Sequence, residues 1–253
     1  MRFELQRADF WKRISALLFD IILLGVIILS AAVGLSAALK FDHYNDYISE
    51  TENALAEQYG INLQISSDEY EALSPEERQK YNDYKGELNS NPRFLAAYTI
   101  RNNLLFVIPS VSILIGYIVT ELIIPIFFKN GQTLGKKAFG LGVVHTNGVR
   151  MRGQAHFIRV IIGKCLIEVL VPFYFIMMMF LGRLGVLGIV MLVLMAGLEL
   201  FSVITTKTRS TIHDLVSDTV VVDFASQMVF ENADELMAYK TRIHEEMANK
   251  QEY

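Results

Sequence analysis

The chain has 253 residues, of which 52% are hydrophobic and only 20% are charged. The apolar residues are gathered into long blocks, which argues against a soluble domain with one large core and favours a protein that crosses a membrane several times. The formal net charge is only -4, but acidic and basic residues occupy different stretches of the sequence. This segregation is the signal for topology.

The first apolar block predicts a membrane-spanning helix over residues 14–39, after a short cytoplasmic N-terminus of residues 1–13. From Ile14 onward it contains one charged side chain, Asp20. At about 1.5 Å per residue it is long enough to cross a hydrocarbon core of roughly 30 Å, and it is too long for the apolar core of a cleaved signal peptide. A carboxylate within a span costs about 2.5–3.5 kcal/mol on insertion scales, so Asp20 is expected to face protein or water.

Residues 40–103 predict an acidic extracytoplasmic loop. The stretch from Phe41 to Ile100 contains twelve acidic and four basic side chains, whereas cytoplasmic loops carry an excess of Lys and Arg. Ser74-Pro75-Glu76-Glu77 has a capping serine, a proline at the first helical position and a glutamate three residues after the cap. We therefore expect a small helical domain here.

A second span is predicted over residues 104–128, followed by a basic cytoplasmic loop over residues 129–156 that has no acidic residue. GQTLGKK in this loop is not a phosphate-binding loop, because only three residues separate its glycines and Lys137 stands where Ser or Thr is required. Asn147-Gly148, flanked by alternating apolar residues, predicts a short β-hairpin.

The third span is predicted over residues 157–181. The alternative is an interfacial amphipathic helix that ends near Glu168, with the span beginning after it. A tight turn leads to a fourth span over residues 186–204. The cytoplasmic segment 205–253 then contains a β-branched run, Thr219 to Val222, that could add a strand to the hairpin, and a polar helix from about Ala233 that Asn232 could cap.

These elements define the expected fold class. It is an all-α polytopic membrane protein with four transmembrane helices, both termini cytoplasmic, a helical extracytoplasmic loop domain and a small cytoplasmic β-hairpin. The expected location is the cell membrane. The single cysteine, Cys165, lies in an apolar block and is expected to be buried.

Three stretches together resemble the RDD family of membrane proteins: Arg13 with Asp20 in the first span, GQTLGKKAFGLGVV after the second span, and RSTIHDLVSDTVVV near the end. The similar region covers residues 10–222, and the family's arginine and two aspartates would correspond to Arg13, Asp20 and Asp214. The acidic loop is longer than in a minimal member, and Ser217-Asp218-Thr219 stands where many members have Ala-Gly-Thr. The resemblance implies a membrane protein, with transport, including sodium/proton exchange, proposed for some members.

Three acidic residues of the spans are expected at a similar depth. Asp20, Glu121 and Glu199 each lie a few residues from the cytoplasmic end of their span, and Lys164 and Glu168 are spaced to neutralise one another as an i,i+4 pair. If arginines pair with all three acids, the cluster is a structural lock. If acids stay unpaired, they would bind a proton or exchange it for a small cation. The candidate charge partners are Arg159, Lys164, Glu168, Arg209 and His213.

The sequence therefore supports two main functional hypotheses. The first is a secondary carrier that exchanges protons with small monovalent cations at Asp20, Glu121 and Glu199, as a homodimer because four spans are few for alternating access. The second is a non-transporting scaffold or accessory subunit that binds partner proteins through its loop or its C-terminal helix. A third hypothesis, weaker than these, is a sensor of anionic lipid. We expect no enzyme activity, no catalytic or metal-ligating residues, no cofactor and no nucleic-acid partner.

Overall fold

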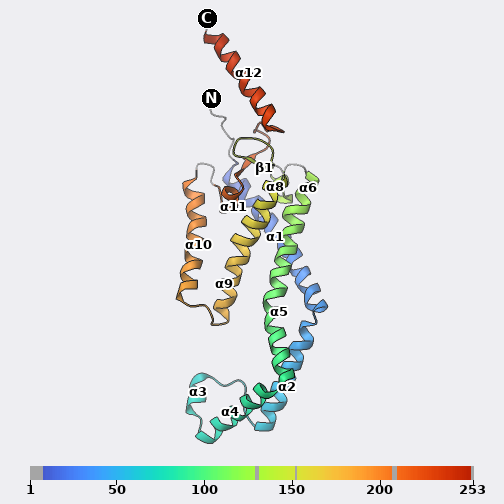
Figure 1. Ribbon diagram of the computed structural model, residues 1–253, viewed down its shortest axis with the longest axis vertical. Helices are drawn as coiled ribbons and strands as arrows, with labels where there is room; N and C mark the ends of the chain where they lie inside the picture. The colour runs from blue at the N-terminus through green and yellow to red at the C-terminus, as the bar shows by residue number, and fades with distance from the viewer. Residues whose placement is uncertain (1–7, 129–130, 152, 207–209, 252–253) are drawn as a thin grey trace. The chain divides into compact units, whose positions relative to one another are not determined.

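The computed structural model describes residues 8–128, 131–151, 153–206 and 210–251, which fall into two units. Unit 1 comprises Met1–Leu29 and Ser112–Tyr253, and unit 2 comprises Ser30–Val111. Each unit has its own packed side chains, and each is described by itself. Figure 1 shows the path of the chain and labels helices of both units.

Four continuous helical stretches are long and apolar enough to cross a membrane. They are α1 (Phe10–Ala38), then α5 (Pro92–Tyr117) continued by the π-helix η1 (Ile118–Ile123) and α6 (Ile124–Phe128), then α8 (Gly153–Phe157) continued by the π-helix η2 (Ile158–Leu170) and α9 (Val171–Phe180), and α10 (Val186–Thr205). Large apolar side chains cover much of their exposed surface, which is typical of helices that face lipid. The four predicted spans are confirmed as helices, and the helix of the second span begins at Pro92, before its predicted start.

The third of these stretches runs without a break from Gly153 to Phe180. The helix therefore does not end near Glu168. Its middle part, η2, is a π-helix, in which each backbone N–H bonds to the carbonyl five residues earlier. The π-helix ends at Leu170, shortly before Pro172, which has no N–H to donate.

Unit 2 confirms the predicted helical loop. Between the apolar helices it contains α2 (Phe41–Tyr59), α3 (Ser67–Ala72) and α4 (Pro75–Ser90). The capping box predicted at Ser74 is present, with Glu77 N–H bonded to the serine hydroxyl and Glu77 returning a bond to the serine backbone. Ile48 of α2, Tyr84 and Leu88 of α4 and Phe94 of α5 are buried together in one small core.

A two-stranded antiparallel sheet in unit 1 corrects the hairpin prediction. The strand β1 (Leu141–His145) pairs with β2 (Thr219–Asp223), far away in the sequence, and not with the residues that follow Asn147-Gly148. That turn forms, but only an isolated bridge between Val144 and Arg150 accompanies it. The prediction of a strand over Thr219 to Val222 is confirmed, as the partner of β1.

Each strand follows a short helix. The helix α7 (Leu134–Ala138) precedes β1, and α11 (Ile212–Val216) precedes β2. Beyond the sheet, the predicted C-terminal helix is α12 (Ala233–Gln251), and Asn232 caps it by accepting a 2.9 Å bond from Glu235 N–H. Leu236 of this helix is buried against Val149 and Phe230. The short helices α7 and α11 position the polar network described next.

Candidate functional site: a charged cavity between short helices and spans

Asp20, inside the first span, is bound by the helix α7. Its Oδ1 accepts a 2.8 Å bond from the backbone N–H of Gly135, and its Oδ2 accepts a 2.5 Å bond from the Thr133 hydroxyl. Thr133 is the N-cap of α7 and accepts in turn from Lys136 N–H at 3.3 Å. The carboxylate thus satisfies backbone and side-chain donors at a helix N-terminus, where negative charge is stabilised. This is the shelter that the sequence required for Asp20.

Close contact with α1 accounts for Gly135, one of the two glycines in GQTLGKK. A Cβ at this position would lie 2.8 Å from Asp20 Oδ1 and would collide with the carbonyl oxygen of Ala16. The loop therefore approaches α1 more closely than any side chain would allow. Its glycine serves contact with a span.

Glu121, in η1, is buried and lies between two lysines. Its Oε1 accepts a 2.6 Å bond from Lys164 Nζ, and its Oε2 lies 4.0 Å from Lys136 Nζ. Lys136 Nζ is also 3.3 Å from the Thr133 hydroxyl. The second ammonium group is therefore less closely held than the first. Burial, together with repulsion from Lys164, lowers the pKa of Lys136 to about 8.

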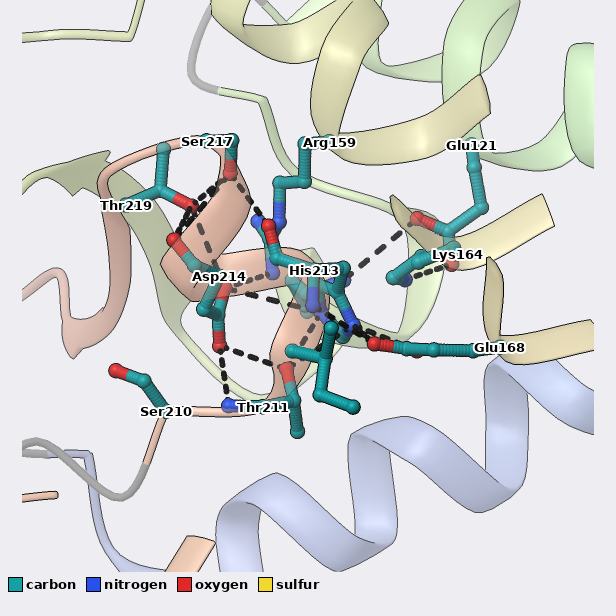
Figure 2. A network of polar contacts seen from close by, with 12 residues as sticks. Glu121, Arg159, Lys164, Glu168, Ser210, Thr211, His213, Asp214, Ser217 and Thr219 are labelled. Atoms are coloured by element: carbon teal, nitrogen blue, oxygen red, sulfur yellow. Dashed lines mark hydrogen bonds and ion pairs between the residues drawn. The ribbon is translucent and has the colours of Figure 1, made fainter. Parts of the chain in front are cut away.

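The helix α11 donates backbone N–H groups to carboxylates of two spans, and Figure 2 shows the contact with Glu168. Glu168 of η2 accepts a 2.7 Å bond from His213 N–H, and its other oxygen lies 2.8 Å from His213 Nδ1. Glu199 of α10 accepts a 3.2 Å bond from Ile212 N–H. Gly163 lets α11 approach η2 closely, because a Cβ there would lie 2.6 Å from the Cβ of His213. Burial and the neighbouring cations, first among them Arg159, lower the pKa of His213 well below its usual value.

Arg159 and Asp214 form an ion pair that is almost fully buried. Arg159 Nη2 lies 2.6 Å from Asp214 Oδ1, and the two side chains are 4% and 1% exposed. Asp214 also accepts bonds from the hydroxyls of Thr211, at 3.1 Å, and Thr219, at 3.4 Å. These bonds join η2, α11 and the start of β2 in one network, as Figure 2 shows.

A cavity of about 500 Å³ lies within unit 1 and reaches most of these groups. Its charged and polar lining consists of Arg13, Asp20, Glu121, Lys136, Arg159, Lys164, Thr211, His213 and Asp214. Its apolar lining comes mainly from the first turns of α1, the last turns of α10 and the sheet. The cavity therefore presents acids and bases together at one end of the spans.

The structure brings together two of the three acids that the sequence singled out. Asp20 and Glu121 both line the cavity, whereas Glu199 is not among its lining residues and caps α11 instead. The expected Lys164–Glu168 pair is wrong, since Lys164 bonds to Glu121 and Glu168 bonds to His213.

The expected arginine partners also differ. Arg159 binds Asp214 and none of the three acids, and Arg209 lies outside the described residues. His213 and Asp214 are neighbours in α11 and have different hydrogen-bond partners. Asp214 forms the capping box of α11 with Thr211, while His213 bonds to Glu168. His145 lies on β1, where its Nδ1 is 3.1 Å from the carbonyl oxygen of Asp218.

Sequence reasoning did not assign Lys136, Thr133 or Thr211 to the site. All three lie in the GQTLGKK and RSTIHD stretches. The signal that could have found them is the threonine that precedes each short helix, because threonine is a favoured N-cap and a cap marks a helix end that needs acceptors.

Residues 7–218 match the model of the RDD family. The chain belongs to the RDD family. Together with the four apolar helices, this membership makes it a multi-pass membrane protein. The residues aligned above with the arginine and aspartates of the RDD name, Arg13, Asp20 and Asp214, come from distant parts of the sequence and line one cavity. No curated protein sequence and no solved structure matches the chain.

The buried ion pair of this RDD protein gives a test of the network. We expect Asp214→Ala to destabilise the protein by about 3–5 kcal/mol, because it leaves the Arg159 guanidinium buried without its counter-charge. Glu231→Ala, which removes the partner of Arg150 from an exposed pair, is the control and should have a much smaller effect. Thermal unfolding in detergent compares the two variants, and equal losses would contradict the assignment.

Proposed function

We propose that this protein exchanges protons for small monovalent cations across the membrane, at Glu121 and Asp20. The observation that carries the proposal is the position of Glu121. Its carboxylate is shared by two lysine ammonium groups inside a cavity that Asp20 also lines. A carboxylate with one close and one loosely held cation can replace the loosely held one.

The position of Lys136 supports the exchange. Its ammonium group lies 4.0 Å from a Glu121 oxygen and 3.3 Å from the Thr133 hydroxyl. When Lys136 releases a proton, its neutral amine no longer balances the Glu121 carboxylate. A monovalent metal cation then takes the place of the ammonium charge. Glu121 and Thr133 provide oxygen ligands for this cation. Asp20 lies beside them, because its carboxylate accepts a 2.5 Å bond from the Thr133 hydroxyl.

The exchange keeps the charge of the site constant. One proton leaves as one monovalent cation enters, so the buried network is never left with an uncompensated charge. The sequence hypothesis placed the exchange at unpaired acids. In this proposal the exchange occurs at Glu121, a paired carboxylate that changes one of its partners. Lys164, at 2.6 Å from Glu121, stays in place as the fixed counter-charge.

The orientation completes the proposal. The loop over residues 40–103 is acidic, and the loop over residues 129–156 is basic. By the positive-inside rule, the loop over residues 40–103 is extracytoplasmic, both termini are cytoplasmic, and the cavity opens toward the cytoplasm.

Glu121→Gln tests the site directly. Purified protein in liposomes with a pH gradient is challenged with sodium, potassium or lithium, and proton flux is followed with a pH-sensitive dye. We expect Glu121→Gln to abolish cation-driven flux, because the amide cannot balance a cation, whereas the control Glu199→Gln, outside the cavity lining, retains it. The scaffold hypothesis would replace this proposal if the unmodified protein shows no flux with any of the three cations.

The pH dependence tests the role of Lys136. Because its pKa is about 8, the fraction that has lost its proton rises as pH increases, and we expect exchange to rise with a midpoint near pH 8. Lys136→Arg should remove this rise and the flux, since a guanidinium stays protonated throughout that range. Lys137→Arg is the matched control, because Lys137 packs over the Phe128 ring. Flux that persists unchanged in Lys136→Arg would exclude Lys136 as the proton-carrying group.

The orientation is tested by cysteine labelling in a Cys165→Ser background. We expect a membrane-impermeant maleimide added to intact cells to label Asn89→Cys in the loop between α1 and α5. Glu245→Cys in α12 should react only after the cells are permeabilised. The opposite pattern would invert the proposed topology.

A further inference from the structure

Two segments of unit 1 correspond in sequence at a constant spacing. Residues from Glu121 to Val144 can be laid over residues from Glu199 to Val222 without a gap. The identical pairs are Glu121 and Glu199, Leu122 and Leu200, Lys129 and Lys207, Thr133 and Thr211, Val143 and Val221, and Val144 and Val222. Several of these are residues that the site uses, so the correspondence is not confined to apolar positions.

The matched stretches also have the same local structure. Thr133 and Thr211 are the residues that precede α7 and α11, and both helices have five residues. Each helix is followed by a residue with positive φ, Gly140 at 68° and Asp218 at 51°. A five-residue strand comes next in both cases. The two segments therefore repeat one pattern of a capped helical turn, a left-handed residue and a strand.

The pairing of the strands relates the two copies by a twofold axis. In the antiparallel register, Val143 lies opposite Val221, which is its own counterpart in the sequence alignment. The same axis relates Leu141 to Thr219 and His145 to Asp223, so it converts the pair Leu141–Asp223 into the pair Thr219–His145. A pseudo-twofold axis thus passes between Val143 and Val221.

The correspondence extends to the spans that precede each segment. Asp20 of α1 accepts from Gly135 N–H at 2.8 Å, and Glu168 of η2 accepts from His213 N–H at 2.7 Å. Gly135 and His213 occupy the same position after their threonines. The two carboxylates therefore bind the same backbone group of their respective short helices.

An arginine precedes each carboxylate. Arg13 comes seven residues before Asp20, and Arg159 comes nine residues before Glu168. The longer spacing lies in the π-helix η2, which takes up more residues per turn than an α-helix. Both arginines thus lie about two turns before the carboxylate of their span, and both line the cavity.

One matched position differs in charge. Lys136 in the first copy corresponds to Asp214 in the second copy. Asp214 binds Arg159, the arginine of its own copy, at 2.6 Å. Lys136 has the opposite charge and lies 4.0 Å from Glu121.

We propose that the chain contains two copies of one module, a pair of spans followed by a capped turn and a strand, and that the second copy is the locked form of the first. The lock is the buried pair between Arg159 and Asp214, and Lys136 at the matching position cannot form the corresponding pair with Arg13, because both side chains are cationic. The cavity lies between the two copies, since it is lined by Arg13 and Arg159 and also by Lys136 and Asp214.

The proposal predicts that an aspartate at position 136 locks the first copy through Arg13. The full-length protein is purified with Lys136→Asp or Lys136→Leu, each in the natural chain and in Arg13→Gln, and thermal unfolding is measured. The leucine variant removes the lysine charge without adding an acceptor. We expect Lys136→Asp to unfold at least roughly 3 °C higher than Lys136→Leu when Arg13 is present, and expect this difference to vanish in Arg13→Gln.

Two results would overturn the proposal. One is an aspartate variant that is no more stable than the leucine variant in the presence of Arg13, and the other is an advantage of the same size with and without Arg13. If Lys136→Asp does not give folded protein, Lys136→Asn takes its place, since its amide oxygen can also accept from a guanidinium. The same two outcomes then decide. The measurement is one of stability, so its result is independent of whether the protein exchanges cations.

Discussion

The need to give every carboxylate in a span a partner organises this structure. An unpaired carboxylate in a bilayer is expensive, and the spans contain four acids near one end. Three of them, Asp20, Glu168 and Glu199, bind backbone N–H groups of α7 or α11. The fourth, Glu121, binds a lysine of another span. The short helices that follow the second and fourth spans therefore provide backbone N–H donors for the carboxylates of the spans.

The same requirement separates the fixed parts of the network from the part that can react. Arg159 and Asp214 form an ion pair at 2.6 Å and are almost fully buried, so separating them would leave two buried charges uncompensated. Lys136 is different, because it competes with Lys164 for one carboxylate and is held at 4.0 Å. The function is therefore proposed at the Lys136–Glu121 contact, where the two opposite charges are held less closely than in the Arg159–Asp214 pair. The repeated module gives this asymmetry an origin in a single position, lysine in one copy and aspartate in the other.

The sequence was sufficient to predict most helices and their caps. It was not sufficient to predict which side chains and strands pair with one another. Long apolar blocks located the four helices, and local capping signals at Ser74 and Asn232 were correct, because these features depend on neighbouring residues. The Lys164–Glu168 pair failed because η2 is a π-helix, in which residues four apart do not stack as they do in an α-helix. The hairpin failed because the Asn147-Gly148 turn competes with a distant strand that buries Val143 and Val221 together. Pairings across the sequence depend on tertiary packing, which local patterns do not encode.

The central claim is that Glu121 is held between lysines of two different segments in a cavity shared with Asp20. A side-chain-resolving density map of the protein in a lipid bilayer tests it most directly. We expect Glu121 within hydrogen-bonding distance of Lys164, with Lys136 beside it and Asp20 on the N-terminus of α7. A map with Lys164 bonded to Glu168 and with Glu121 turned toward the acyl chains would contradict it.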